Sequence, residues 1–428
     1  MMRLLILADD LSGAADCGAP CAAAGLKTIV ALKDIAGGVH ADVVSFDANT
    51  RSMEPQQAAG EIARLIASYV REDVFLFKKI DSTLRGNISA ELYAALETCR
   101  GIYSGRPVAV IAPAFPAGGR TTINGMQMLH DQPLHESELW RLHAISGSSY
   151  IPEMLCASGL RSETLSLELI HSTAVLEDAM RSAAADTDVL VCDARTDADL
   201  QAIAQALMKL SRQVIWVGSA GLAGHLPQAL GLIPTAPVES PVLPALSGPL
   251  LFVVGSLSRK SIGQVLLLAS SSSVLRIAVP IAALLAGTAS PQWREYKQEL
   301  ERAIGAGQDV VLSPESEPQV EMSQRPLLSA ALASMTASVS GRAGALIASG
   351  GETARAVLDS WDVSQLRLIG EVEKGVPISI AENWARPLPV ITKAGDFGNP
   401  ETLLNCRRFL HDGSRFIGHP MYMDENSL

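Results

Sequence analysis

The sequence predicts an α/β protein of two domains with mostly parallel sheets, joined by a proline-rich linker. The first observation is a repeated order of short apolar run, small-residue turn and helical stretch, which is typical of βαβ units. The second is length, because 428 residues exceed the size at which one hydrophobic core usually stops growing. The third is the segment 234–246, where four prolines within eleven residues exclude a helix or a central strand. We therefore expect one domain over residues 1–233 and another over 247–428.

The first half of the chain opens with a buried strand and a helix. Leu4–Ala8 is a continuous apolar run, which is typical of a parallel strand whose two faces are both covered. A small-residue turn follows, and an alanine-rich helix is predicted to end near Gly25. The same pattern predicts further strands at Thr28–Leu32, Val43–Phe46, Val74–Lys78, Val108–Ala112, Val189–Cys192 and Val214–Val217, with helices between most of them, for example Gln56–Tyr69 and Ala198–Leu210.

The alternation restarts after the linker. We expect strands at Leu250–Val254, Val310–Leu312, Ala345–Ala348 and Leu388–Thr392. The first and third of these are each followed by a helical pattern, and the last by a turn. The ten C-terminal residues, His419–Leu428, are predicted to form a surface tail.

Composition argues against several classes of partner. Hydrophobic residues make up 48% and charged residues 18% of the chain, which is typical of a well-packed globular protein. The net charge of -11, with no basic run interleaved with aromatics, argues against nucleic acid. No apolar run reaches the roughly 20 residues that span a bilayer, and Leu4–Ala8 is too short for a signal-peptide core. Six cysteines without framework spacing indicate reduced thiols, so we expect a cytoplasmic protein that binds no membrane.

Two acidic residues follow the first predicted strand. Ligands of open α/β sheets bind at the carboxyl ends of the strands, and Asp9 and Asp10 lie there, directly before a helix. Two carboxylates in that place can position a hydroxyl, act as a general base or hold Mg²⁺. The alternative is that one of them only caps the helix. Because one cap needs one carboxylate, the pair favours a ligand role for the other.

Cations and hydroxyls gather at the next strand ends. The segment Lys78–Asn87 offers cations to pair with a carboxylate, and hydroxyl and Asp side chains to bond sugar hydroxyls; the alternative is a solvated loop. Arg51, at the end of the preceding βα unit, adds a cation. The turn Ala112–Thr122 presents Arg120 on a rigid backbone, or is only structural. The candidate residues of the first segment are Lys78, Lys79, Asp81, Ser82, Thr83 and Arg85.

Three strand ends of the second domain carry glycines. Glycine lets a backbone approach phosphate closely, and a helix N-terminus adds amide donors. The sequence contains neither G-x-x-x-x-G-K-[ST] nor G-x-G-x-x-G in its first unit, which excludes a P-loop enzyme and leaves a dehydrogenase as a weak alternative. A nucleotide polyphosphate site is therefore predicted at Ser256, Ser258, Gly350, Gly351, Gly395 and Gly398.

Taken together, six segments resemble the four-carbon acid sugar kinase family. They span nearly the whole chain in the expected order: Ala8–Ala14, Lys78–Asn87, Pro113–Arg120, Gly218–Gly221, Ser349–Thr353 and Lys393–Gly398. The resemblance implies an N-terminal domain that binds a sugar acid and a C-terminal domain that binds ATP with Mg²⁺. It implies phosphoryl transfer to a terminal hydroxyl across the cleft between them. Known family substrates are D-threonate, D-erythronate and 3-oxo-tetronate, and the form of Lys79–Gly86 favours an aldonate, D-threonate before D-erythronate.

Site residues follow where the family's motifs match. For the sugar acid they are Asp10, Arg51, Lys79, Asp81, Ser82 and Thr83, to which the charge pattern adds Asp9 and Arg85, with Asp10 or Asp81 as the catalytic residue. For the nucleotide they are Ser258, Gly350, Gly351, Glu352, Thr353 and Gly395, to which the glycine-turn pattern adds Ser256 and Gly398. Metal ligands are not assigned. The sequence departs from the family's pattern over Glu138–Ser149, which bears on the substrate if that stretch shapes the pocket rim. A homodimer is compatible with the sequence, and a non-catalytic sensor of sugar acid or nucleotide is the alternative class.

Overall fold

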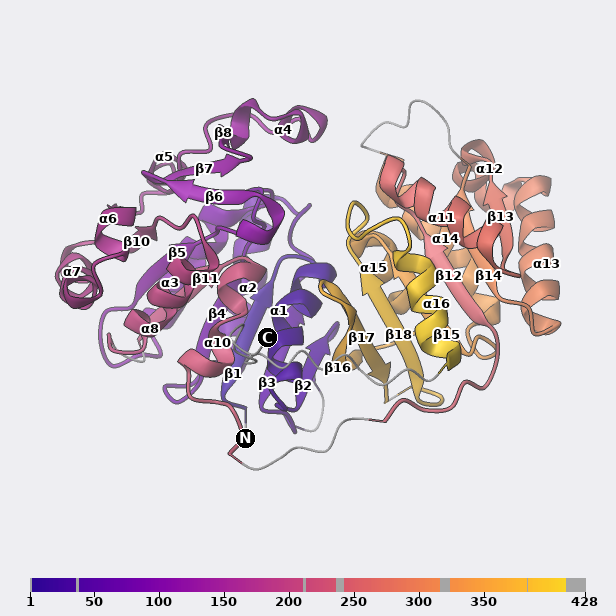
Figure 1. Ribbon diagram of the computed structural model, residues 1–428, viewed down its shortest axis with the longest axis horizontal. Helices are drawn as coiled ribbons and strands as arrows, with labels where there is room; N and C mark the ends of the chain where they lie inside the picture. Colours follow the sequence, from indigo (N-terminus) through magenta and orange to yellow (C-terminus); the bar gives the residue numbers. More distant parts are fainter. Residues whose placement is uncertain are drawn as a thin grey trace, which may run out of the picture. The chain divides into compact units, whose positions relative to one another are not determined.

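The computed structural model describes residues 2–35, 38–210, 213–235, 242–315, 324–382 and 384–412. The chain forms two compact units, Met1–Pro237 and Val238–Leu428, and each is described by itself (Figure 1). Residues 236–241 of the predicted linker lie outside the described residues, as does the predicted tail His419–Leu428. Within the described ranges, no helix combines the length and the apolar character that a bilayer crossing requires.

The first unit contains a parallel sheet in the order β2-β3-β1-β4-β11-β5-β10-β9. All seven strands predicted from apolar runs are present. The eighth, β9, was missed because its sequence Ser-Glu-Thr-Leu is mostly polar, as suits the edge of a sheet. The bounds are β1 Leu4–Ala8, β2 Thr28–Ala31, β3 Val43–Asp47, β4 Phe75–Lys79, β5 Val108–Ala112, β9 Ser162–Leu165, β10 Val189–Cys192 and β11 Val214–Gly218.

Helices cover both faces of this sheet, and each face has its own apolar core (Figure 1). On one face, α2 contributes Ile62 and α3 contributes Leu92, both fully buried. On the other face, α1 contributes Cys17 and α8 contributes Leu200. Buried positions in α2 recur at helical spacing, so a single stripe of the helix faces the sheet. The bounds are α1 Leu11–Ala23, α2 Pro55–Tyr69, α3 Ile88–Arg100, α7 Thr173–Asp186, α8 Asp197–Leu207, α9 Ala220–Ala223 and α10 Leu226–Ala229.

An antiparallel insertion follows β5 and lies outside the main sheet (Figure 1). Backbone hydrogen bonds join Thr122 and Ala194 in both directions, and the Asp193 carboxylate accepts the amides of Asn124 and Gly125 at 2.7 and 2.9 Å. The insertion is therefore held at its base by the end of β10. Its elements are the 3₁₀ turn η1 Pro116–Gly118, β6 Arg120–Ile123, β7 Met126–Leu129, β8 Gln132–Pro133, the 3₁₀ turn η2 Leu134–Glu136, α4 Glu138–Leu142 and α5 Ile151–Cys156. After β9, the short helix α6 Leu167–Ile170 packs with α7 and α8.

The second unit contains a sheet in the order β13-β14-β12-β15-β18-β17-β16. Its first five strands are parallel, and β17 pairs antiparallel with both β18 and β16. The four predicted strands are present, whereas β13, β16 and β17 were missed because none is a short continuous apolar run. The bounds are β12 Leu250–Val254, β13 Leu275–Val279, β14 Val310–Pro314, β15 Ala345–Ser349, β16 Gln365–Glu373, β17 Val376–Ala381 and β18 Leu388–Lys393.

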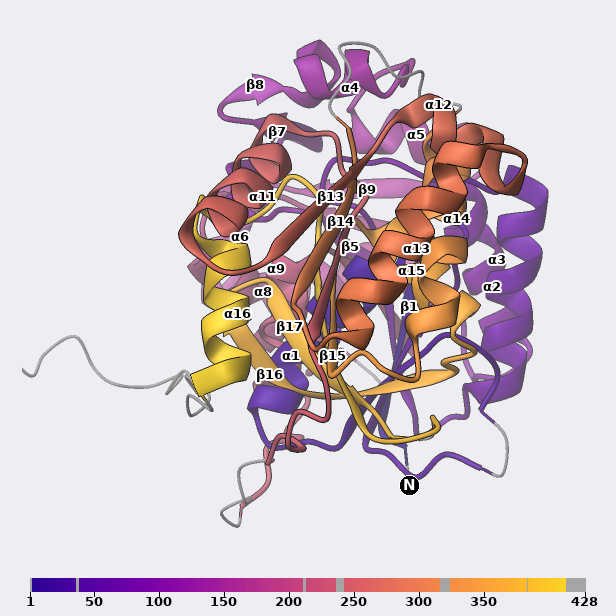
Figure 2. The same ribbon diagram turned by 90° about the vertical axis from the view of Figure 1, so that its right-hand side faces the viewer.

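Helices again cover both faces of the second sheet. On one face, α11 packs with α16, and Leu268 and Phe409 enter the same core (Figure 2). The other face carries α14 and α15, which pack against each other. The bounds are α11 Arg259–Ser271, α12 Ile281–Ala286, the 3₁₀ turn η3 Gly287–Ala289, α13 Pro291–Gly305, α14 Arg325–Thr336, the 3₁₀ turn η5 Ala337–Val339, α15 Gly351–Ser360 and α16 Thr402–Asp412.

Candidate functional site

The turn after β1 uses its two acidic residues differently. Asp10 is the N-cap of α1, and its Oδ1 accepts the Gly13 amide at 2.8 Å. Asp9 makes no such cap and is 3% exposed. A side chain at position 13 would place Cβ 2.2 Å from the Nζ of Lys79, so glycine leaves room there for the ammonium group. Asp10 therefore caps the helix, as one of the two interpretations predicted. The Asp9 carboxylate makes no cap and pairs with cations instead.

Arg51 joins both carboxylates from the turn after β3. Its Nε and Nη2 donate to Asp9 Oδ2 and Oδ1 at 2.7 and 3.0 Å, which is a bidentate pair. Its Nη1 donates to Asp10 Oδ2 at 2.6 Å. Lys79, the last residue of β4, places Nζ 3.4 Å from Asp9 Oδ1. The ends of β1, β3 and β4 thus meet in one cluster of charges, as the topology of adjacent parallel strands requires.

In the loop that follows β4, the Asp81 carboxylate accepts hydrogen bonds from two side chains of the same loop. Thr83 donates its hydroxyl to Asp81 Oδ2 at 2.5 Å, and Nε of Arg85 donates to the same oxygen. Leu84 has a φ of 55°, which is unusual for a residue with a branched side chain. Ser82 is half-buried. The loop therefore holds a fixed and somewhat strained conformation around the Asp81 carboxylate.

These ionic contacts decide the protonation of the buried groups. Burial alone would raise the pKa of Asp9, but Arg51 and Lys79 outweigh it and hold that pKa well below its ordinary value. Burial likewise opposes ionisation of Asp81, and Arg85 and Arg51 depress its pKa well below the ordinary value. Burial lowers the pKa of Lys79, but Asp9 and Asp10 reverse the effect and raise it. Asp9 and Asp81 are therefore carboxylates, and Lys79 is an ammonium, throughout the physiological range.

The cluster is neutral as a whole, and Arg85 is its most open cation. Three carboxylates, Asp9, Asp10 and Asp81, are balanced by Arg51, Lys79 and Arg85. The side chain of Arg85 is 30% exposed. Among the described residues, its guanidinium bonds through Nε alone, so its two terminal nitrogens remain to receive an anionic ligand.

The expectation that Lys78 joins Lys79 at this edge is wrong. Successive residues of a strand point to opposite faces, and Lys78 turns away to pair with Glu91 of α3 at 2.8 Å. Both side chains are 1% exposed. Glu91 was not among the residues predicted from the sequence, although an acidic residue within a helix that follows a lysine-bearing strand is a usable signal. Lys78 and Glu91 are therefore a buried structural pair that connects β4 to α3.

Asn87 connects two loops of the charged cluster. Its amide nitrogen donates to the carbonyls of Thr50 and Met53 at 3.0 and 2.9 Å. The loop carrying Arg51 is thereby fixed to the loop carrying Arg85. Arg120, the other cation considered from the sequence, is the first residue of β6 in the antiparallel insertion.

The second unit brings two of its predicted turns together around Gly395. Ser258 caps α11 by accepting the Ser261 amide at 3.1 Å, and its hydroxyl donates to the Gly395 carbonyl at 3.4 Å. The hydroxyl of Ser261 donates to the same carbonyl. A side chain at position 395 would place Cβ 2.6 Å from the Oγ of Ser256, so only glycine permits this approach. The ends of β12 and β18 therefore meet at Ser256, Ser258 and Gly395.

Gly350 and Lys393 bring the third turn to the same place. Gly350 has a φ of 102°, begins α15 as its N-cap and donates its amide to the Lys393 carbonyl at 2.9 Å. The ammonium of Lys393 is 1% exposed and donates to Ser349 Oγ, Ala394 O and Gly395 O at 3.0, 3.0 and 3.3 Å. Burial lowers the pKa of Lys393 to about 8. Lys393 lies in the Lys393–Gly398 motif, but no role for it was predicted from the sequence.

The remaining nucleotide candidates have different surroundings. Glu352 is exposed in the first turn of α15, whereas Thr353 is buried and its hydroxyl lies 3.1 Å from that of Ser329. A side chain at Gly255 would place Cβ 2.0 Å from the Thr353 hydroxyl oxygen, so Thr353 packs beneath the β12 turn. Gly398, with a φ of 86°, lies against Thr402 at the start of α16. Glu352 thus borders the turns from solvent, and Thr353 and Gly398 support them from within.

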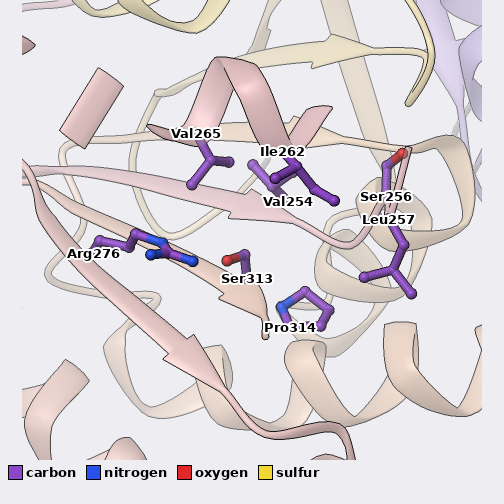
Figure 3. Close-up of a pocket in the computed structure, with 8 residues that line it drawn as sticks. All are labelled: Val254, Ser256, Leu257, Ile262, Val265, Arg276, Ser313 and Pro314. Carbon is purple, nitrogen blue, oxygen red and sulfur yellow. The ribbon is translucent and has the colours of Figure 1, made fainter. Parts of the chain in front are cut away.

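A small pocket adjoins Ser256 at the carboxyl ends of β12 and β14 (Figure 3). Val254, Ile262 and Val265 line one side of it, and Ser313 and Pro314 another. The figure shows the Arg276 guanidinium of β13 pointing toward Ser313. The volume of the pocket is about 20 Å³, which is room for about one water molecule, so it is a small cavity beside the turn and not a pocket for a nucleobase. In the portion of the chain described by the structure, no group of three or more His, Cys, Asp or Glu side chains forms a metal cage.

Two family models match the chain in the order of its units. A model described as a sugar-binding N-terminal domain matches residues 4–226, and one described as a nucleotide-binding C-terminal domain matches residues 251–403. The charged cluster lies within the first match. All of the glycine turns lie within the second.

Relatives and a solved structure agree over nearly the full length. A D-threonate kinase of Cupriavidus necator is 39% identical over 414 residues, covering 94% of this chain and 96% of the relative. A D-threonate kinase of Bordetella bronchiseptica is 32% identical over 428 residues, covering 95% and 97%. A solved structure from Salmonella typhimurium has a TM-score of 0.76 at 20% identity, covering 96% of this chain and 99% of that one, which shows the fold.

Proposed function

Because this chain belongs to the four-carbon acid sugar kinase family, we propose that it uses ATP to phosphorylate the terminal hydroxyl of a four-carbon sugar acid, converting D-threonate to 4-phospho-D-threonate. The observation that carries the proposal is the cluster around Asp9, Arg51 and Asp81. It lies at the carboxyl ends of β1, β3 and β4, within the segment matched by a sugar-binding domain.

The acid binds to this cluster through groups that the chain already holds in place. The terminal nitrogens of Arg85 pair with the carboxylate, because they are the open cationic donors of the loop. Asp81, Ser82 and Thr83 bond the sugar hydroxyls. Lys79 and Arg51 keep Asp9 ionised, and Arg51 also fixes the orientation of the Asp10 carboxylate.

ATP binds to the turns at the ends of β12, β15 and β18 in the second unit. The positive φ of Gly350 and the tight approach of Gly395 to Ser256 leave backbone accessible to phosphate, and α11 and α15 begin there. Gly351, Glu352 and Ser258 border the same turns.

Mg²⁺ enters this scheme with the nucleotide. Mg²⁺ usually keeps several waters and is held by substrate phosphates with one or two carboxylates, so a site without a metal cage of its own is compatible with it. Glu352 and Asp396 are the exposed carboxylates at the turns and are the candidates to hold it. The ion supplies charge neutralisation on the phosphates.

In the transfer step, the protein forms no covalent bond to the substrate and acts by positioning the reactants and stabilising charge. A bond forms between the terminal hydroxyl oxygen and the γ-phosphorus, the bond from that phosphorus to the bridging oxygen breaks, and ADP leaves. Asp81 has a depressed pKa, so it suits accepting a hydrogen bond from a hydroxyl better than taking its proton. Asp10 is the candidate to take that proton, and Arg51 fixes its orientation.

ADP release from MgATP tests the proposal. The assay uses D-threonate, L-threonate, D-erythronate, L-erythronate and 3-oxo-tetronate, each against a blank without acid. Stimulation by D-threonate above the others supports the proposal. Stimulation by D-erythronate or 3-oxo-tetronate instead retains the kinase and changes its substrate. Nucleotide binding without stimulation by any acid would favour a non-catalytic sensor.

The cellular setting and assembly belong to the same proposal. The six cysteines, all within described residues, are free thiols, which suits the reducing cytoplasm. Light scattering on the purified chain decides between a monomer and the homodimer that the sequence allows.

A further inference from the structure

The loop between Asp81 and Arg85 is held from outside by the antiparallel insertion. Gln127 of β7 donates its Nε2 to the Ser82 carbonyl at 2.8 Å. Trp140 of α4 donates its indole Nε1 to the Thr83 carbonyl at 2.9 Å. Two consecutive carbonyls of the acid-binding loop are therefore fixed by side chains that lie 45 and 57 positions away in sequence.

Both donors are themselves held in place. Gln127 is fully buried, and its Oε1 accepts the Thr122 hydroxyl at 2.8 Å, which fixes the side-chain amide so that Nε2 faces Ser82. Trp140 is 3% exposed, and Ser137 caps its helix by accepting the Trp140 amide. Since the insertion is anchored to Asp193 and Ala194 at the end of β10, these contacts connect the loop to a rigid support.

The loop needs such a support. Leu84 has a φ of 55°, a left-handed conformation that is sterically unfavourable for a residue with a Cβ, and such strained backbone persists only where its surroundings over-determine it. Inside the loop, Thr83 and Arg85 both bond Asp81, which aligns the side chains but leaves the Ser82 and Thr83 carbonyls to other donors. Gln127 and Trp140 supply those donors. Because the Ser82 and Thr83 carbonyls point toward the insertion, the side chains of Asp81, Thr83 and Arg85 are held in the arrangement described above.

We propose that Gln127 and Trp140 are positioning residues for the sugar acid, acting through the Ser82 and Thr83 carbonyls. The inference rests on the proposed function, which places the acid at this loop. It also gives a role to part of Glu138–Ser149, where the sequence departs from the family's pattern, because Trp140 lies in that stretch. Small displacements of positioned groups cost binding and rate, so this support bears on which acid is accepted.

Trp140→Phe and Gln127→Met test the inference, with Trp361→Phe as the matched control. Trp140→Phe keeps an aromatic ring but removes the indole donor together with part of the side-chain volume, and the control loses the same volume. Trp361, in the second unit, is 4% exposed and loses an equivalent bond, from Nε1 to the Thr336 hydroxyl at 3.1 Å. The two loop variants should raise the KM for the acid about five- to tenfold, as expected for one lost hydrogen bond, and leave the KM for ATP unchanged. Trp361→Phe should share any loss of melting temperature without the change in KM.

Hydrogen exchange at the Leu84 amide supplies a readout that does not depend on turnover. This amide donates to the Asp81 carbonyl at 2.9 Å, and its exchange should accelerate in both loop variants and not in Trp361→Phe. Unchanged exchange, or faster exchange with an unchanged KM for the acid, would overturn the inference. If the unmodified protein turned over none of the acids, the proposed function would fail, while exchange at Leu84 would still decide whether Gln127 and Trp140 hold the loop.

Discussion

Asp10 has two roles that single substitutions can separate. It caps α1 through Oδ1 and pairs with Arg51 through Oδ2. Asn is as good a cap as Asp, so both variants lose the ion pair with Arg51 but only Asp10→Ala also loses the cap, and it should be less stable than Asp10→Asn by about 1 kcal/mol. Both should lower kcat by roughly 10²–10⁴-fold if Asp10 takes the hydroxyl proton. Urea unfolding and steady-state kinetics on the two variants measure these effects, and near-normal turnover by Asp10→Asn would remove Asp10 from the base role.

Lys393 should make stability depend on pH in the alkaline range. Burial lowers its pKa to about 8 in the folded chain, against 10.5 for an ordinary lysine. Between those values the unfolded chain binds more protons, so the free energy of unfolding rises with pH, and the cost of the buried ammonium is present below pH 8. Relative to Lys393→Met, the unmodified protein should therefore gain up to about 1.4 kcal/mol per pH unit across this window. Urea unfolding of both proteins from pH 7.5 to 10 measures the difference, and parallel curves would contradict the assigned pKa.

The contact between β4 and α3 depends on a buried ion pair that can be removed singly or as a whole. Glu91→Gln leaves the Lys78 ammonium buried without its counter-charge and should cost about 3–5 kcal/mol. The double variant Lys78→Met/Glu91→Leu removes both charges and should recover most of that loss, because apolar replacements of buried ion pairs are often neutral. Urea unfolding decides between the two. If the double variant were as unstable as Glu91→Gln, the net contribution of the ion pair to stability would exceed the cost of burying its two charges.

The elements could be predicted from the sequence where one local pattern decides them. Continuous apolar runs located the central parallel strands, whereas the edge strand β9 and the hairpin of β16 and β17 lack such runs. For the charged cluster, the sequence predicted that Asp9, Arg51 and Lys79 lie at neighbouring strand ends, and these residues do meet at one edge of the sheet. The sequence could not show that Lys78 turns to Glu91, or that Arg51, Gln127 and Trp140 reach partners 42, 45 and 57 positions away. Those contacts depend on which distant segments pack together in the folded chain, and a local sequence pattern does not contain that information.

Each unit of the molecule should respond to its own ligand. Anything that binds only the folded state stabilises it, by about 2.7 kcal/mol at a ligand concentration of 100 Kd. D-threonate should slow hydrogen exchange around Arg51 and Leu84 in the first unit, and MgATP should slow it around Gly350 and Gly395 in the second. Exchange mass spectrometry with each ligand alone measures both effects. Protection of the first unit by MgATP, or of the second by the acid, would contradict the assignment of ligands to units.

The neutral balance of the charged cluster governs how a substrate first reaches it. Three carboxylates offset three cations there, and the chain as a whole carries a charge of -11, so a distant anion meets no attractive field and a weak repulsive one. Dissolved salt confines that repulsion to about 8 Å at physiological ionic strength. The encounter should therefore proceed faster as salt is added, the reverse of proteins that steer their anions electrostatically. Under the proposed function, selection then rests on contacts made after arrival, between the open nitrogens of Arg85 and the carboxylate of the acid.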